Sequence, residues 1–255
     1  MGNKTVNILL KTEGITKKFS KFIALAGVSI GVKEGEIRSI IGPNGAGKTT
    51  FLNVLTGKFR PTEGAVYFEG QDITGKPPYE IVRYGIARTF QIVNIFPELT
   101  VLENIMMPIL TKRRKNMDFF SPPSDDRDIT EKSLKIISEI GLEKDAMTLA
   151  RSLSHGDKRK LDIGIGLAQD PRLILLDEPC AGLGLREKKS ITRLILEVAE
   201  RKNLTIILVE HDMNIVFSIS HNITVFHQGV VIAEGSPEEV RKDKLVIKAY
   251  LGEDF

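Results

Sequence analysis

The sequence predicts an α/β fold in which a mostly parallel β-sheet carries an antiparallel β part at its N-terminus and a helical insertion. About the first 90 residues contain strand-like runs bounded by Gly or polar turns, and residues 96–169 have helical periodicity. After residue 170, apolar strands alternate with helices, which is typical of a mostly parallel sheet covered on both faces. We therefore expect residues 1–255 to form a single domain, with a core (1–95 and 170–255) and a helical subdomain (96–169).

The composition is that of a soluble globular protein. Hydrophobic residues make up 42% of the 255 residues and charged residues 27%, and the net charge of +3 is too small to indicate nucleic-acid binding. The single cysteine, Cys180, excludes an intramolecular disulfide, and we interpret it as a small space-filling residue. No apolar run approaches the ~18–20 residues that span a bilayer, and we expect no signal peptide.

The N-terminal part contains three strand-like runs, VNILLKTEGI, GVSIGVKEGEIRSIIG and GAVYFEGQDI. The second run ends in a glycine-rich loop, and a helical pattern follows from Lys48 to about Gly57. Glycine just beyond the last helical residue is a common helix stop, so we expect this helix to end there.

The helical insertion begins with TVLENIMM, in which Thr100 and Glu103 form a predicted capping box. Residues 112–128, KRRKNMDFFSPPSDDRD, are interpreted as an exposed loop, and TEKSLKIISEIG as an amphipathic helix that stops at Gly141. The stretch LSHGDKRK predicts a further helix start, with Ser154 and Asp157 as its capping box.

The last part alternates between strands and helices. RLILLDEP and TIILVEHD are continuous apolar runs typical of buried parallel strands, while EKKSITRLILEVAERK and MNIVFSIS have helical patterns. ITVFHQGVVIAEG is expected to form a hairpin. SPEEVRKD then begins a helix with Ser236 as N-cap, Pro237 at the first helical position and Glu239 completing a capping box.

The most specific local signal is GPNGAGKT, which fits the phosphate-loop pattern G-x-x-x-x-G-K-[ST] between a strand and a helix. Glycines at 42, 45 and 47 let the backbone wrap an anion, and the loop N–H groups and the helix N-terminus supply positive partial charge. Lys48 is expected to reach the β- and γ-phosphates and Thr49 to hold Mg²⁺. The predicted nucleotide-binding residues of this loop are Gly42, Pro43, Asn44, Gly45, Ala46, Gly47, Lys48, Thr49 and Thr50.

Two further segments supply the groups that hydrolysis needs. In LILLDE an apolar strand ends at Asp177, which can hold Mg²⁺ through water, and Glu178 is placed to orient or deprotonate an attacking water. His211 ends the next apolar strand, at the edge where α/β sheets place their ligands, although a single histidine there can also be structural.

Together GPNGAGKTT, RTFQ, LSHGD, LILLDE and VEHD occur in the order found in the ATP-binding-cassette (ABC) ATPases, and this resemblance covers nearly the whole chain. It implies the P-loop NTPase ABC-ATPase fold with a RecA-like core, and ATP and Mg²⁺ as cofactors. It also implies head-to-tail pairing of two ATPase subunits, with each ATP held between the P-loop of one subunit and the LSHGD helix of the other.

The resemblance also assigns roles to single residues. Ser154 and the Gly156 N–H would donate to the γ-phosphate bound by the partner subunit, while Ser154 still caps its own helix in a free subunit. His211 would contact the γ-phosphate. Phe19 would stack on adenine, with a core position as the alternative. Gln91 would contact Mg²⁺ or the attacking water, with an ordinary polar strand end as the alternative.

The LSHGD segment departs from the family pattern Leu-Ser-Gly-Gly-Gln, because His155 and Asp157 replace its third and fifth residues. Gly184 stands where the family often has an aspartate that communicates across the dimer, which puts the coupling of the two sites in doubt. LSHGDKRKLDIGIGLAQDP, DEPCAGL, HQGVVIAEG and AYLGEDF resemble the ATPases of branched-chain amino-acid importers. GEIRSIIGPNGAGKTTFLNVLTGKFRP leans toward urea-importer members of that group.

The predicted function is therefore an ATPase subunit that drives a membrane importer of branched-chain amino acids or of urea and short amides. Its expected partners are a second ATPase subunit, two transmembrane permease subunits and, indirectly, a solute-binding protein. A heterodimer is favoured over a homodimer, and no nucleic acid is expected. The expected location is peripheral, at the cytoplasmic face of the plasma membrane. The alternatives are an exporter, including a lipid exporter, a soluble ABC ATPase acting on DNA or ribosomes, and a P-loop kinase or GTPase.

Overall fold

The computed structural model describes residues 7–89, 95–116 and 126–251. Gln91 lies outside the described residues. The strands are β1 (Ile8–Phe19), β2 (Phe22–Val28), β3 (Gly31–Lys33), β4 (Ile37–Ile41), β5 (Glu63–Phe68), β6 (Gln71–Asp72), β7 (Ile86–Arg88), β8 (Leu173–Asp177), β9 (Thr205–Val209), β10 (Asn222–His227) and β11 (Val230–Gly235). The α-helices are α1 (Lys48–Leu55), α2 (Pro78–Ile81), α3 (Val101–Asn116), α4 (Asp126–Glu139), α5 (His155–Leu167), α6 (Leu185–Lys202), α7 (Met213–Ile219), α8 (Pro237–Lys242) and α9 (Lys244–Leu251).

The central sheet has the strand order β11-β10-β4-β9-β8-β7. Strands β10, β4, β9, β8 and β7 run parallel to one another, and β11 closes one edge as the antiparallel half of a hairpin with β10. The predicted, mostly parallel sheet is therefore confirmed, as is the predicted hairpin. All the parallel strands end at one edge, which places the loops that follow β4, β8 and β9 beside one another.

A second, antiparallel sheet forms from the N-terminal part, with the order β2-β1-β5-β6 and with β3 paired to β1. The run from residue 27 to residue 42 is divided between the two sheets, because β3 joins the antiparallel sheet whereas β4 enters the parallel one. The chain turns between them at Gly35, whose φ of 72° lies in the left-handed region that favours glycine.

The parallel sheet is buried on both faces, and its side chains alternate accordingly. In β8, Leu173 and Leu175 pack into the apolar cluster that holds α1 and the antiparallel sheet, whereas Ile174 and Leu176 pack into the cluster that holds α3 to α6. A strand covered on both sides reads as a continuous apolar run, which explains the sequence of this segment.

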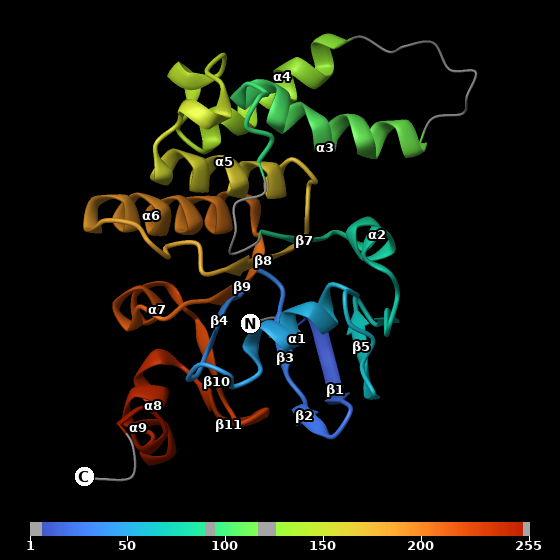
Figure 1. The fold of residues 1–255 in the computed structure, drawn as a ribbon, viewed down its shortest axis with the longest axis vertical. Coiled ribbons are helices and arrows are strands. Elements are labelled where there is room, and N and C mark those ends of the chain that lie inside the picture. The colour runs from blue at the N-terminus through green and yellow to red at the C-terminus, as the bar shows by residue number, and fades with distance from the viewer. Residues whose placement is uncertain (1–6, 90–94, 117–125, 252–255) are drawn as a thin grey trace, which may run out of the picture.

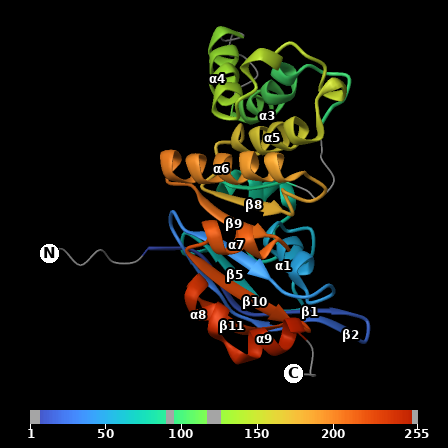
Figure 2. The same ribbon diagram turned by 90° about the vertical axis from the view of Figure 1, so that its left-hand side faces the viewer.

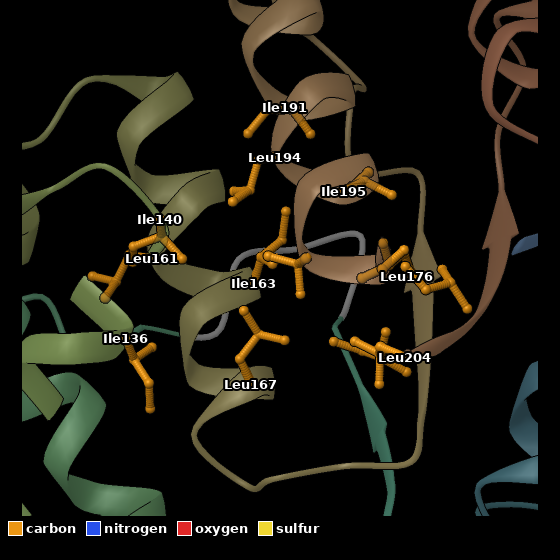
Figure 3. Close-up of a cluster of buried hydrophobic side chains, with 14 of the residues drawn as sticks. Ile136, Ile140, Leu161, Ile163, Leu167, Leu176, Ile191, Leu194, Ile195 and Leu204 are labelled. Atoms are coloured by element: carbon orange, nitrogen blue, oxygen red, sulfur yellow. The ribbon is translucent and has the colours of Figure 1, made fainter. Parts of the chain in front are cut away.

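Helices α3, α4 and α5 lie at one end of the molecule (Figures 1 and 2), and α5 reaches the sheet, since a Cβ on its Gly166 would lie 2.9 Å from the Ile174 side chain of β8. Side chains of α5 point to both neighbours, with Leu161 toward Ile140, which directly follows α4, and Ile163 toward Leu194 of α6 (Figure 3). A continuous apolar core therefore joins the helical layer to the sheet.

The helix boundaries confirm most of the predicted signals. Helix α1 ends at Leu55, and Gly57 follows with a φ of 71° and an N–H bonded to the Val54 carbonyl at 3.1 Å. The Thr100 capping box is present, with the Thr100 N–H donating to Glu103 at 2.7 Å. The Ser236 capping box also forms at the start of α8.

The predicted loop over residues 112–128 is wrong at both ends. Helix α3 continues to Asn116 and α4 already begins at Asp126. Lysine and arginine have high helix propensity, so the basic run that suggested a loop extends the C-terminal end of α3 instead. Among the helices of the described residues, none combines the length and the apolar character that a membrane crossing requires.

Candidate functional site

Three neighbouring strands bring the phosphate loop, Glu178 and His211 to one edge of the sheet. The phosphate loop follows β4, Glu178 follows β8, and His211 lies two residues beyond β9. Strand β9 pairs with both others, matching Val209 to Ile40 on one side and to Asp177 on the other. Motifs that are more than 100 residues apart in the sequence are thus adjacent in space.

Two glycines of the phosphate loop pack so closely on neighbouring backbone that no side chain would fit at their positions. At Gly42 (φ 152°) a Cβ atom would lie 2.2 Å from the Phe226 carbonyl oxygen, and at Gly47 (φ 103°) it would lie 2.7 Å from the Ala24 carbonyl oxygen. At Gly45 (φ 79°) a Cβ would meet nothing within 4 Å. The loop is therefore packed against β2 and β10 behind Gly42 and Gly47, and it is open at Gly45.

The β10–β11 turn braces the loop from behind, since the Gly229 N–H donates to the Ala46 carbonyl at 3.0 Å. On the other side Asn44, Gly45 and Thr49 are exposed, and Pro43 and Thr50 are half-buried. This exposed backbone at a helix N-terminus is the geometry in which N–H groups bind phosphate.

Lys48 is buried, with 6% of its surface exposed, and its ammonium donates to the carbonyls of Gly42 at 2.6 Å and Pro43 at 3.0 Å. Burial lowers the pKa of Lys48, while the nearby carboxylates of Glu178 and Asp177 act to raise it. The ammonium therefore sits inside the loop, close to where bound phosphates would replace the carbonyl oxygens as acceptors.

Asp177 is buried at the end of β8 and forms an ion pair with Arg88 of β7, with 2.8 Å between Oδ2 and Nη2. The Arg88 guanidinium also donates to Asn53 of α1 at 2.7 Å. This contact links the strand that carries Asp177 to the helix that follows the phosphate loop, so it fixes the carboxylate relative to the loop.

Glu178 and His211 contact each other directly, with 2.9 Å between Glu178 Oε1 and His211 Nε2. Glu178 has a φ of 51°, which is uncommon for a residue with a side chain, and its N–H donates to the Val209 carbonyl of β9 at 2.9 Å. The Glu178 side chain is 19% exposed and that of His211 is 45% exposed, so both can reach a ligand at the sheet edge.

Glu210 connects the turn after β8 with the turn after β9. Its carboxylate, although buried, accepts the Cys180 N–H at 2.8 Å and the His211 N–H at 3.2 Å. Burial raises the pKa of Glu210, and these two backbone bonds act to lower it. The turn after β8 and the turn after β9 are thus held in fixed relation by one carboxylate.

Phe19 is not a core residue, because 41% of its surface is exposed at the end of the β1–β2 hairpin. Its ring makes an edge-on contact with Phe59 at 5.3 Å between centroids, and the Lys17 ammonium lies 5.1 Å from its ring centre. The core alternative considered for this residue is thereby removed, and its stacking on adenine stays a prediction.

The N-terminus of α5 is closed by groups of the same chain. The Ser154 hydroxyl accepts the Asp157 N–H at 3.1 Å and lies 2.7 Å from the Asp157 carboxylate, so Ser154 is the predicted N-cap. The Gly156 N–H donates to Glu187 of α6 at 3.2 Å. The self-capping interpretation of LSHGD is therefore confirmed for the single chain.

The residues present fit a nucleotide with a magnesium ion. Gly42 and Gly47 let the loop backbone pack closely on β10 and β2, the helix N-terminus and Lys48 supply positive charge, and Asp177 adds a carboxylate at the sheet edge. Magnesium is commonly bound through one or two protein oxygens together with phosphate oxygens. In this arrangement the oxygens would come from Thr49 and Asp177.

Comparison with known proteins identifies the family. A family model described as ABC transporter matches residues 25–181, which is more than half of the chain. The chain belongs to the ABC transporter ATP-binding family. A second model, described as branched-chain amino acid ATP-binding cassette transporter, matches residues 230–255.

Individual relatives of this ABC cassette agree with the assignment. A protein named high-affinity branched-chain amino acid transport ATP-binding protein BraF, from Pseudomonas aeruginosa, is 40% identical over 96% of this chain and 98% of its own length. The crystal structure of the ADP conformation of an ABC transporter cassette has a TM-score of 0.85 at 36% identity, covering 96% and 99% of the two chains. A dimeric post-hydrolysis cassette bound to ADP and Pi has a TM-score of 0.76 at 29% identity, covering 89% and 98%.

The structure adds three site residues that sequence reasoning missed: Arg88, Glu187 and Glu210. Arg88 lies within the RTFQ motif and Glu210 within VEHD, so the motifs were found but these members were given no role. Of these three, Glu187 lacks a motif signal, because its contact is with Gly156 of another helix, 31 residues away in the sequence.

Proposed function

We propose that this ABC ATPase is the energy-coupling subunit of a membrane importer, in which ATP binding closes a pair of cassettes and hydrolysis reopens it. The observation that carries the proposal is the contact between Glu178 and His211 at the edge of the sheet that also bears the phosphate loop. A carboxylate held by an imidazole beside a triphosphate cradle is the arrangement that activates water for hydrolysis.

In the proposed reaction the loop N–H groups and Lys48 hold the phosphates, and Phe19 stacks on the adenine ring. Glu178 accepts a proton from the attacking water, and His211 holds the γ-phosphate and orients Glu178. When bound, Mg²⁺ supplies charge neutralisation at the β- and γ-phosphate oxygens, and Thr49, Asp177 and Gln91 would hold it. Arg88 keeps the Asp177 carboxylate in position through their ion pair.

The second half of the proposal concerns the partner ATPase subunit. Helix α1 packs on one face of the parallel sheet and α5 on the other, which supports a phosphate contact of α5 with another subunit's ATP. Ser154 and the Gly156 N–H would make that contact. A solved relative is a dimer bound to ADP and Pi, which supports the same arrangement. In the transporter we favour a related ATPase subunit over a second copy of this chain.

The proposed solute class is branched-chain amino acids. The support is the printed name of the relative and the family model that matches residues 230–255. Urea remains a sequence-based preference that the reported relatives do not share. The proposed partners are two permease subunits and, indirectly, a solute-binding protein. The proposed location is the cytoplasmic face of the plasma membrane, and the proposed domain division is a core of 1–95 and 170–255 with a helical subdomain of 96–169.

The hydrolytic assignment is tested with Glu178→Gln. We expect kcat for ATP hydrolysis to fall by about 10²–10⁴-fold, because the glutamine cannot accept the proton, while ATP binding is retained. Turnover and nucleotide binding are measured on the same preparations, with Glu200→Gln on the α6 surface as the matched control. Hydrolysis that continues at the parent rate in Glu178→Gln would contradict the assignment.

The solute is tested by reconstituting the chain with its permease subunits in vesicles and measuring ATP-dependent uptake of labelled leucine and labelled urea. The proposal predicts uptake of leucine that is lost with Glu178→Gln. Uptake of urea alone would replace the proposed solute class, and outward movement of either solute would replace import.

A further inference from the structure

The N–H group of Gly156 donates to a carboxylate of its own chain. Glu187 Oε1 accepts this N–H at 3.2 Å, and Glu187 Oε2 accepts the N–H of Gly184 at 3.0 Å. The approach is close, since a Cβ on Gly156 would lie 2.9 Å from Glu187 Oε1. One half-buried carboxylate thus bridges the N-termini of α5 and α6.

The other donor proposed for the partner's phosphate also has an internal partner. The Ser154 hydroxyl lies 2.7 Å from the Asp157 carboxylate, which Lys160 also contacts at 2.9 Å. In the unpaired chain both donors at the start of α5 therefore face carboxylate oxygens. A carboxylate and a phosphate have similar acceptor oxygens, and both prefer a helix N-terminus.

A backbone N–H makes one strong hydrogen bond at a time. If the Gly156 N–H is to reach a γ-phosphate, Glu187 has to release it, and the negative charge of Glu187 also opposes an approaching triphosphate. After release Glu187 can still cap α6 through Gly184, so the carboxylate does not lose both partners.

We propose that Glu187 is an internal competitor for the phosphate site of α5, which raises the ATP concentration needed to pair two cassettes. This inference rests on the proposed function, because it takes Gly156 as a donor to the partner's ATP. Helix α6 follows the turn that contains Glu178. Release of Glu187 when two cassettes pair would therefore also couple pairing to the hydrolytic site of the same chain.

The test uses the full chain with hydrolysis blocked by Glu178→Gln, and light scattering records how much dimer forms as MgATP is added. Adding Glu187→Gln keeps the size and capping ability of the side chain but removes its charge. We expect the MgATP midpoint for dimer formation to fall by about tenfold, since a charge-assisted hydrogen bond no longer has to be broken.

Two further variants separate the contact from its side effects. Glu187→Asp keeps the charge at the start of α6 but shortens the side chain away from Gly156, so its midpoint should also fall. Glu103→Gln is the matched control, because Glu103 caps α3 through Thr100 in the same way as Glu187 caps α6. Its midpoint should stay at the parent value, and thermal unfolding confirms that all variants are folded.

The outcomes distinguish this inference from the proposed function. If the parent forms a dimer with MgATP and Glu187→Gln pairs at the same or a higher midpoint, the inference is overturned and the proposed function stands. If the parent and every variant bind MgATP but stay monomeric, pairing of this chain with itself is contradicted and the inference falls, whereas the favoured pairing with a related ATPase subunit is not contradicted by that result.

Discussion

Cys180 is two residues from Glu178, yet its surroundings make it a poor nucleophile. It is 1% exposed, and burial raises the pKa of its thiol to about 12, with the Glu210 carboxylate adding to the shift. A thiol is reactive as its thiolate, and a pKa of about 12 leaves little thiolate at neutral pH. This environment agrees with the interpretation of Cys180 as a space-filling residue.

We therefore predict that iodoacetamide alkylates the folded chain at pH 8 at least about 100-fold more slowly than the urea-unfolded chain, because the unfolded thiol has an ordinary pKa. Mass spectrometry of the native and unfolded chain measures the two rates. Rapid, complete modification of the native chain would show that Cys180 is accessible and ionised.

Gly42 is the glycine whose backbone is packed most tightly in the phosphate loop. In Gly42→Ala the new Cβ would collide with the Phe226 carbonyl, so the loop or β10 must move. We expect the free energy of unfolding to fall by about 2–4 kcal/mol. The matched control is Gly70→Ala, which also has a positive φ but meets nothing within 4 Å, with an expected loss of about 1 kcal/mol.

Urea denaturation of the two variants measures the difference. Equal losses in Gly42→Ala and Gly70→Ala would mean that positive φ alone, and not the packing of the loop against β10, sets the requirement for glycine at position 42.

For single residues, the sequence predicts which positions belong to the site better than it predicts which side chains contact each other there. The spacing of GPNGAGKT is local, so the loop could be predicted with its residue numbers. The partner of Asp177 could not, because Arg88 reaches it only through the pairing of β7 with β8, and that pairing is set by the strand order of the whole sheet.

At the scale of single elements, the capping boxes show how local chemistry sets helix boundaries. The Ser236 N–H and hydroxyl both contact Glu239, at 2.7 and 2.8 Å, and these bonds lower the pKa of Glu239 below its ordinary value of 4.5. A lowered pKa in the folded state means that the ionised form stabilises α8. That stabilisation is present above pH 4.5 and is lost as the pH falls through the lowered pKa.

We predict that Glu239→Gln lowers the melting temperature at pH 7 and that the difference from the parent shrinks well below pH 4.5. Thermal unfolding at several pH values measures this. The control is Glu238→Gln in the same first turn, which shares the helix dipole but not the capping box. If Glu238→Gln shows the same pH-dependent difference, the cap is not its source.

The one element predicted wrongly, the loop at 112–128, shows what local reading misses. Charge and the proline-containing stretch suggested a loop, but helix propensity carries α3 through Asn116. The division of residues 27–42 into β3 and β4 could not be predicted from the sequence either, because both halves have strand patterns and differ only in the sheet that they join.

At the scale of the whole molecule, the parallel sheet separates the two surfaces that an ABC dimer would bring together. The phosphate loop leads into α1 on one face, while α5 packs with α3, α4 and α6 on the other (Figure 1). The order of motifs allowed the family resemblance to be stated from the sequence. The Ser154 cap of α5 could be predicted from LSHGD, but the contact of the Gly156 N–H with Glu187 could not, because it depends on how α5 packs against α6.

The central claim, that the LSHGD helix binds a phosphate held by another cassette, is tested most directly by MgATP-dependent pairing of Glu178→Gln. Because the chain carries both surfaces, the isolated chain is expected to pair with itself once hydrolysis is blocked. Light scattering should show a monomer that becomes a dimer with MgATP, and adding Ser154→Arg should abolish the dimer while ATP binding is retained. A Ser154→Arg variant that pairs as readily as its parent would show that this helix only caps itself.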